Sequence, residues 1–258
     1  MKTKKEIKQY YKEQAQKFGI DGRSTISDIN TRNLEINALL KYIKGNKKVL
    51  EVGCGNGYTA RVMIQKKKIN LTAIDFSEDL IKVAKKQPLN NIKGKVHFNV
   101  GDTTKLDFPK ESFDVVFTER CLINLITRGN QKKALLEIHR VLKRGGIFIM
   151  LEDFTDGWKN MNEAREELGL KMIPQPAHNL FFDKEKLLRF TKNKFDFLKE
   201  DNFLSTYYFG SRIIYPALLK LATGKEPKYE SLINSFFAEM PPYGNHSAIK
   251  IIVFKKID

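Results

Sequence analysis

Three glycines at alternate positions, Gly53, Gly55 and Gly57, lie where a short apolar segment changes into a helical one. Glycine adopts left-handed backbone conformations without strain and lets a ligand approach the main chain closely. The spacing G-x-G-x-G differs from the G-x-G-x-x-G of a dinucleotide site, in which a helix N-terminus meets a pyrophosphate. The turn therefore predicts close approach of a small ligand, and the third glycine is misplaced for a dinucleotide.

Two acidic residues follow the next two apolar segments. Asp75 comes 22 residues after Gly53, and Asp102 ends the run Val100-Gly101-Asp102. An acid about 20 residues past a glycine turn can accept hydrogen bonds from ribose hydroxyls. A carboxylate at the second position can accept from an exocyclic amine or place a loop under an adenine ring. Together these features predict an adenosine pocket; the alternative is that both acids merely cap helices.

The elements that must position these residues alternate regularly in the first half of the chain. Expected strands are 48–52, 69–75, 96–100, 113–118 and 147–151, and expected helices lie near 60–64, 77–84 and 131–143. Apolar residues in the last helix recur at i, i+3 and i+4. This rhythm predicts βαβ units on a parallel sheet, whose carboxyl ends bind ligands.

The second half is less regular. We expect helices at 160–168 and 183–190, a loop at 171–182, strands at 203–209 and 248–254, and a helical insertion at 210–245 between those strands. The whole chain, 1–258, is interpreted as one α/β domain. Its expected parts are an N-terminal helical lid at 1–45, a ligand-binding core at 46–155 and a substrate-side half at 156–258.

The charge of the chain limits the kinds of binding partner that it can be expected to have. Lys plus Arg is 46 and Asp plus Glu is 30, which gives a net charge of +16. This charge fits a nucleic acid, a small acidic substrate or simply a solvated lysine surface. Only 10 of the basic residues are Arg, the usual reader of bases and planar anions, so nucleic acid is disfavoured.

No apolar run reaches the ~20 residues of a membrane span, and no membrane partner is expected. Two cysteines fit neither a disulfide framework nor a zinc site, so we expect a cytoplasmic protein without metal.

The motifs jointly resemble those of class I S-adenosylmethionine-dependent methyltransferases. Glu51-Val52-Gly53-Cys54-Gly55-Asn56-Gly57 resembles their first motif, Ile74-Asp75-Phe76-Ser77 the second and Gly101-Asp102 the third; Phe113-Asp114-Val115-Val116 and the run from Val141 to Gly146 resemble their fourth- and fifth-strand signatures. The resemblance implies a Rossmann-like, mostly parallel seven-stranded sheet flanked by helices, with an antiparallel last strand. Usually a short hairpin joins the last two strands, so the long insertion departs from the pattern.

The resemblance also implies a cofactor, S-adenosylmethionine, and residues that bind it. The glycine turn would line its methionine end, Asp75 its ribose and Asp102 its adenine. The expected cofactor set is Arg32, Glu51, Gly53, Cys54, Gly55, Asn56, Gly57, Asp75, Phe76, Asp102, Thr103 and Glu119.

Candidate catalytic residues are His178, Glu119 and Asp153, because a sugar hydroxyl benefits from a general base near neutral pH. His178 lies on the 171–182 loop, where it could instead only fix that loop by a hydrogen bond. The two acids follow expected strands, where they could instead be caps. Candidate substrate residues are Tyr11, Arg120, Asn124, His178 and Tyr243.

Lid-like additions favour an enclosed pocket for a small, anionic acceptor. The expected reaction is O-methylation of a sugar, a phosphate or phosphoramidate, or a nucleotide-activated intermediate. The chain also resembles methyltransferases of bacterial capsule and surface-polysaccharide pathways, including those that supply O-methyl phosphoramidate groups. The alternatives are an RNA methyltransferase and a non-catalytic binding protein of the same fold. The 210–245 insertion could instead make an oligomer contact.

Overall fold

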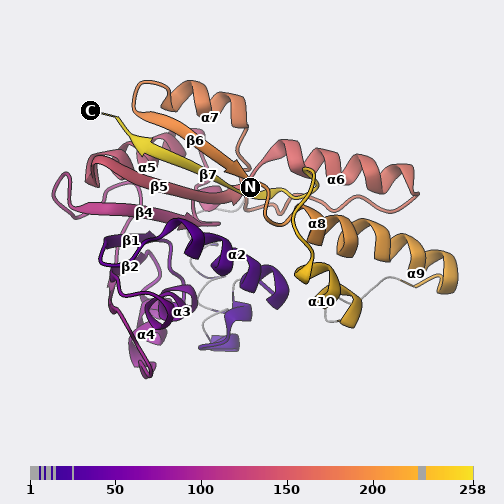
Figure 1. Ribbon diagram of the computed structural model, residues 1–258, viewed down its shortest axis with the longest axis horizontal. Helices are drawn as coiled ribbons and strands as arrows, with labels where there is room; N and C mark the ends of the chain where they lie inside the picture. The colour runs from indigo at the N-terminus through magenta and orange to yellow at the C-terminus, as the bar shows by residue number, and fades with distance from the viewer. Residues whose placement is uncertain are drawn as a thin grey trace.

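The protein forms a seven-stranded sheet with helices on both faces (Figure 1). A computed structural model describes residues 16–24, 26–225 and 231–257, and the single positions 6, 9 and 13. The strand order is β3-β2-β1-β4-β5-β7-β6. The strands are β1 Lys48–Val52, β2 Asn70–Asp75, β3 Lys95–Val100, β4 Phe113–Glu119, β5 Leu142–Asp153, β6 Phe195–Asp201 and β7 Ile249–Lys256.

The helices of the described part occupy the positions that the alternating pattern requires. They are η1 Gly22–Ser24, α2 Ile29–Tyr42, α3 Tyr58–Lys66, α4 Glu78–Lys86, η2 Leu122–Asn124, α5 Arg128–Val141, α6 Thr155–Glu167, α7 Lys184–Thr191, α8 Ser205–Tyr208, the π-helix η3 Phe209–Ile214, α9 Tyr215–Thr223 and α10 Leu232–Glu239. Ser77 caps α4 as its position predicts, because its side chain accepts from the Leu80 N–H.

Strands β1 to β5 run parallel, so their carboxyl ends meet at one edge of the sheet. Strand β7 is antiparallel to both β5 and β6, which confirms the expected mixed sheet. The chain continues from β1 to β2 on one side and later adds β4 on the other. Ligands of open α/β sheets bind beside such a reversal of strand order.

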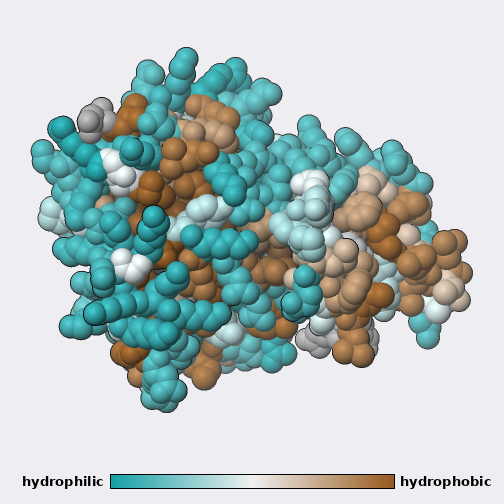
Figure 2. Space-filling model, viewed as in Figure 1, coloured by the Kyte–Doolittle hydropathy of each residue, from teal (hydrophilic) through white to brown (hydrophobic). Residues whose placement is uncertain are grey.

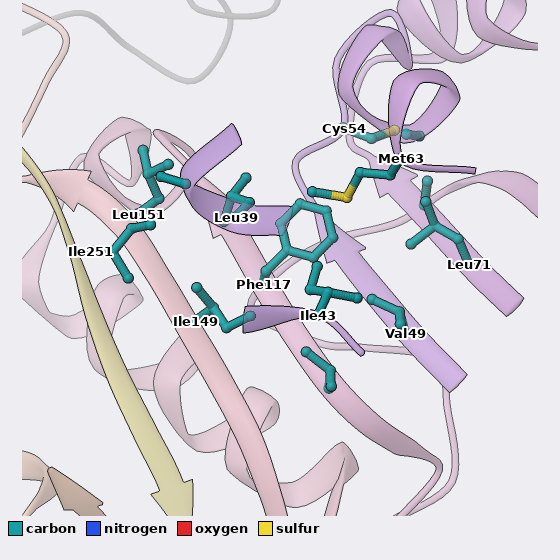
Figure 3. Packing of buried hydrophobic residues seen from close by; sticks show 14 of the residues in the cluster. Leu39, Ile43, Val49, Cys54, Met63, Leu71, Phe117, Ile149, Leu151 and Ile251 are labelled. Carbon is teal, nitrogen blue, oxygen red and sulfur yellow. The ribbon is translucent and has the colours of Figure 1, made fainter. Parts of the chain in front are cut away.

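Alternate side chains of the strands fill two apolar layers. Val49, Phe117 and Ile149 pack against α2 and α3 on one face, where Figure 3 shows Leu39 of α2 and Ile43, the residue after this helix, lying over the sheet. The opposite face packs against α5 and α7. Because both faces are covered, the central strands are continuously apolar, as their sequence indicates.

The expected strand at 203–209 is wrong. Strand β6 instead spans Phe195–Asp201, and residues 205–214 are helical. The Phe195–Asp201 segment is an edge strand with mostly exposed side chains, so it lacks the apolar pattern of a buried strand. Aromatic residues at 203–209 mimic a strand, but Tyr207 packs into the core from a helical turn. The helices between the last strands therefore begin before residue 210.

A buried lysine joins the late elements. The ammonium of Lys250 on β7 is 2.7 Å from Asp156 Oδ2, 2.9 Å from Glu200 Oε1 and 3.0 Å from Asn245 Oδ1, and its side chain is fully buried. Burial alone would raise the pKa of Asp156 and of Glu200, but hydrogen bonds and charges of nearby lysines outweigh it and lower both. Lys250 therefore ties β6, α6 and the 245 turn to β7.

Replacing Lys250 by Met should lower the free energy of unfolding by roughly 3 kcal/mol, because two partly buried carboxylates lose their shared cation. Urea titration at pH 7 measures the change. The matched control is Lys255→Met on the same strand, where the side chain is exposed and the change should stay below about 0.5 kcal/mol. Equal effects of the two substitutions would contradict this account.

Candidate functional site

A cavity of about 530 Å³ lies at the carboxyl ends of the parallel strands. This volume falls within the usual range for small-molecule sites. Its walls combine the glycine turn, both acids of the adenosine prediction and the segment before α2. The lining residues are Phe18, Arg23, Ile26, Ser27, Arg32, Gly53, Cys54, Gly55, Asn56, Tyr58, Thr59, Asp75, Phe76, Asp102, Thr103, Thr104, Glu119, Arg120, Cys121, Ile123, Asn124, Leu125, Ile126, Asn130, Pro176, His178 and Asn179.

The glycine turn has the backbone that only glycine adopts readily. Gly53, Gly55 and Gly57 have φ values of 85°, 54° and 74°. A Cβ on Gly53 would lie 2.4 Å from Cys121 Sγ, and one on Gly57 would lie 2.6 Å from the Phe98 ring. The turn is thus pressed against the chain after β4 on one side and against β3 on the other.

The two acids hold the loops that face the cavity. Asp75 accepts from the backbone N–H of Gly55 and of Ser77, both at 2.9 Å. Burial raises the pKa of Asp75 in spite of these hydrogen bonds. Asp102 is exposed and accepts from the Thr104 N–H at 2.8 Å. Ser77, not Asp75, is the N-cap of α4, and the fully described chain from Asp102 to β4 forms no helix. The alternative that both acids serve only as helix caps is therefore wrong.

A buried cluster of four charges clamps α2 to the end of β4. Arg32 Nη1 is 2.7 Å from Glu119 Oε1, Arg120 Nε is 2.7 Å from Glu35 Oε1, and Arg32 is also 3.8 Å from Glu35. Arg120 adopts a left-handed φ of 48°, which is rare for a residue with a side chain. Arg32 itself lies in the first turn of α2.

Burial and charge act in opposite directions on the two acids of the cluster. Burial raises the pKa of Glu35 to about 8, although Arg120 lowers it. Burial would also raise the pKa of Glu119, but the charges of Arg32 and Arg120 outweigh it and hold that pKa below its ordinary value. Glu119 is therefore a weak base, and its expected role as a catalytic base finds no electrostatic support.

The turn after β4 is fixed from below by Glu152 on β5. Its carboxylate accepts from the backbone N–H groups of Cys121, Leu122 and Ile123 at 3.2, 2.9 and 3.2 Å. Burial raises its pKa to about 7. The neighbouring Asp153 is buried as well, and burial raises its pKa to about 6 although Arg120 lowers it. Glu152 therefore holds the backbone of a turn whose residues Cys121 and Ile123 line the cavity.

The start of α2 is anchored to the helices that follow β6. Asp28, the N-cap of α2, forms a buried ion pair with Arg212 of η3. The Tyr207 hydroxyl lies 2.9 Å from both oxygens of the same carboxylate. The segment just before this cap supplies Ile26 and Ser27 to the cavity. The helices between β6 and β7 therefore position one wall of the site.

Most of the predicted site residues meet in one place. The cavity is lined by Arg32, Gly53, Cys54, Gly55, Asn56, Asp75, Phe76, Asp102, Thr103, Glu119, Arg120, Asn124 and His178. Glu51 is buried but does not line the cavity. Gly57, the N-cap of α3, does not line it either. Tyr11 lies outside the described residues.

Two expected site residues do not reach the cavity. Tyr243 is 76% exposed, and its N–H donates to Thr206 Oγ1, so it lies on the surface of the turn before β7. Asp153 is buried but absent from the lining, because its carboxyl group lies beside Arg120 under the wall. The cavity lining therefore gives no support to substrate contact by Tyr243 or to catalysis by Asp153.

Sequence reasoning missed the apolar part of the lining. Phe18, Ile26, Ile123, Leu125, Ile126 and Pro176 resemble core or loop residues in sequence. It also missed Glu35, although Arg32 and Glu35 share one face of a helix at i, i+3. The i, i+3 spacing was a signal that the sequence offered. It could not reveal the partners of these two residues, Glu119 at the end of β4 and Arg120 just after it, which are more than 80 positions away.

Comparison with known proteins points in the same direction as the site. Residues 49–146 match the family model described as a methyltransferase domain. A demethylmenaquinone methyltransferase of Leptospira interrogans is 40% identical over 111 residues, covering 42% of this chain and 43% of that protein. The chain thus spans less than half the length of this curated relative. Over this stretch, which holds the glycine turn and both acids, the chain is similar to methyltransferases.

Two further relatives extend the match over most of the chain. A ubiquinone/menaquinone biosynthesis C-methyltransferase of Rickettsia bellii is 28% identical and covers 80% of this chain and 77% of that protein. A solved S-adenosylmethionine-dependent methyltransferase from Thermotoga maritima has a TM-score of 0.60 at 20% identity, covering 96% of this chain and 99% of that chain. This last likeness shows the fold. The names of these proteins do not mention capsule or polysaccharide chemistry, which stays a sequence hypothesis.

The residues present suit S-adenosylmethionine, the cofactor that the sequence motifs imply, which carries positive charge at its sulfonium and amino groups. Burial raises the pKa of Glu51 and of Asp75, and Glu51 Oε2 is a buried oxygen without a hydrogen-bond partner among the described residues. A cation in the cavity would lower both pKa values and so would bind favourably. Among the described residues no cluster of side chains could hold a metal ion.

Replacing Asp153 by Asn should change how stability depends on pH. Because the pKa of Asp153 is about 6 in the folded protein, the folded state keeps a proton that the unfolded chain loses near pH 4. The free energy of unfolding of the unsubstituted protein should therefore fall, relative to the variant, as pH rises from about 4 to about 6. Urea titrations across this window should show a relative loss of up to about 3 kcal/mol. If the free energy of unfolding changed with pH in the same way for both proteins, the raised pKa of Asp153 would be contradicted.

Proposed function

We propose that the protein transfers the methyl group of S-adenosylmethionine to a small, largely apolar acceptor enclosed in the cavity. The observation that carries this proposal is the composition of the wall. The lining joins the glycine turn and the acids with apolar side chains, among them Ile123, Leu125 and Ile126 from the segment after β4. No lysine is among the described lining residues.

The arginines of the wall are already engaged. Arg23 pairs with Asp21 at 2.7 Å, and Arg32 and Arg120 belong to the buried cluster. The net charge of +16 favours an anionic acceptor, as the sequence suggests, but this charge does not gather in the cavity. The names of the Leptospira and Rickettsia relatives point to quinone biosynthesis, which supports an acceptor of ring type.

Two amide oxygens are placed to bind a ligand. Asn124 Oδ1 and Asn179 Oδ1 are buried, lack a hydrogen-bond partner among the described residues, and belong to residues of the cavity wall. Asn124 is fixed by its Nδ2, which donates to the Arg120 carbonyl at 2.8 Å. Each oxygen would accept from an N–H or O–H of a bound molecule, because a buried acceptor left unpaired is costly.

S-adenosylmethionine supplies an electrophilic methyl group on sulfur when it is bound. Asp75 and Asp102 would hold its adenosine, and the glycine turn would let its methionine end approach the main chain. The apolar wall excludes water and orients the acceptor for an in-line attack. His178 lies on the opposing loop, where it would take the proton that the acceptor loses as its new bond to the methyl carbon forms.

The test is methyl transfer from labelled S-adenosylmethionine into a cell extract that is then separated into organic-soluble, water-soluble, RNA and protein fractions. We expect label in the organic-soluble small molecules. The control Asp75→Asn should bind the cofactor about 10- to 100-fold more weakly, through loss of a charged hydrogen-bond acceptor, and label correspondingly less. Label in water-soluble anions would replace the apolar acceptor by the anionic one, and label in RNA would overturn both. Cofactor binding without labelling of any fraction would indicate a non-catalytic protein.

His178→Ala should lower kcat by about 10²- to 10⁴-fold and abolish the acidic limb of the pH–rate profile, while the KM for the cofactor changes little. Steady-state kinetics with the identified acceptor measures this. Asn179→Ala, on the same loop, is the matched comparison and should raise KM and leave the shape of the pH profile unchanged. A normal kcat in the His178 variant would show that the loop only encloses the substrate.

A further inference from the structure

Apolar side chains gather on the outside of the helices between β6 and β7. Figure 2 shows them over the end of the molecule that α9 and α10 form in Figure 1. Leu232 is 92% exposed, Leu221 86% and Phe236 63%. We define the α9–α10 patch as the exposed residues Leu218, Leu221, Leu232, Ile233 and Phe236.

Phe237 and Ala238 of α10 pack partly against the core, but the apolar residues of the patch do not. Pro216 is the buried residue of α9, and Asn234 is the buried residue of α10. Isolated exposed leucines are common on soluble proteins. A larger exposed apolar set on two helices instead marks a site of contact with a protein or a membrane. The patch is separate from the cavity, because none of its residues line it.

We infer that the α9–α10 patch docks on the surface of an anionic lipid bilayer. The patch lies at a projecting end of the molecule, a shape that can enter the headgroup region (Figure 1). Lys220 and Lys225 are exposed beside it. Leucine and phenylalanine on one side with lysine nearby is the composition of helices that lie in a membrane interface.

Charge distinguishes the bilayer from a second copy of the chain. Two copies that each carry +16 repel one another, whereas an anionic bilayer attracts each of them. Such attraction concentrates the protein at the surface, and insertion of the leucines would then hold it there. Charge therefore favours lipid over the oligomer contact that the sequence suggested for 210–245, and a peripheral lipid contact replaces the expectation that no membrane takes part.

The contact is peripheral. Among the helices of the described part, none is long and apolar enough to cross a bilayer. Interfacial helices bury their apolar side chains roughly 5–10 Å into the boundary between headgroups and acyl chains. Binding should therefore be reversible, should require anionic lipid, and should weaken as salt screens the lysines. The inference does not depend on the proposed reaction, because it concerns a different surface.

Vesicle flotation with the purified full chain tests the inference. Vesicles of phosphatidylcholine with about one third phosphatidylglycerol should bind the protein, and vesicles of phosphatidylcholine alone should bind it at least about tenfold less. The double variant Leu221→Asp, Leu232→Asp should lose at least about tenfold of the binding to anionic vesicles, because two apolar anchors become anions. Leu198→Asp is the matched control; this leucine is 50% exposed on edge strand β6, outside the patch, and its replacement should leave binding unchanged.

Circular dichroism and cofactor binding show whether each variant is folded, so that a loss of vesicle binding can be assigned to the patch. If light scattering shows that the unsubstituted chain dimerises and the double variant does not, and vesicles are not bound, the patch is a contact between copies and the inference is overturned. Equal vesicle binding by the double variant and the unsubstituted chain would also overturn it, since the scattered lysines alone would then be responsible.

Discussion

The site depends on a buried cluster of charges that joins α2 to the end of β4. Burying a carboxylate or a guanidinium alone is very unfavourable, so Arg32, Glu35, Glu119 and Arg120 are acceptable inside the protein only when all four are assembled. Their assembly holds the first turns of α2 beside the carboxyl end of β4. The cavity is the space that remains between that helix, the glycine turn and the 171–182 loop. The ion pair of Asp28 with Arg212 fixes the other end of the same wall.

The electrostatics of this arrangement suit a cationic cofactor and an acceptor of low charge. Asp75 and Glu119 line the cavity and Glu51 is buried next to the glycine turn in sequence, and burial raises the pKa of Glu51 and Asp75. Every arginine of the wall has an acidic partner, and the lysines that give the chain its charge lie elsewhere. The excess positive charge thus belongs to the outer surface. There it can act on an anionic bilayer together with the exposed leucines of the α9–α10 patch.

The first half of the fold could be predicted from the sequence because its signals are local. These signals are glycines that need positive φ, a serine helix cap, and alternating strand and helix patterns. They predict where the sheet lies and where the glycine turn lines the cavity. Strand β6 could not be found this way, since an edge strand exposes most of its side chains and Phe195–Asp201 looks polar. The ion pairs that shape the wall were equally hidden, because Arg32 and Glu119 are 87 positions apart. Tyr243 and Asp153 lie outside the lining for a different reason, since position along a loop or strand end does not fix the direction of a side chain.

The most direct measurement is a crystal structure of the protein with S-adenosylhomocysteine, the product that the cofactor leaves after transfer. The account predicts that the ribose hydroxyls lie within hydrogen-bond distance of Asp75, that the adenine lies beside Asp102, and that the sulfur faces the space between Asn124 and His178. A ligand that binds outside this cavity would contradict the account. So would an adenosine bound there with its sulfur turned away from His178, because no acceptor in the cavity could then be attacked in line.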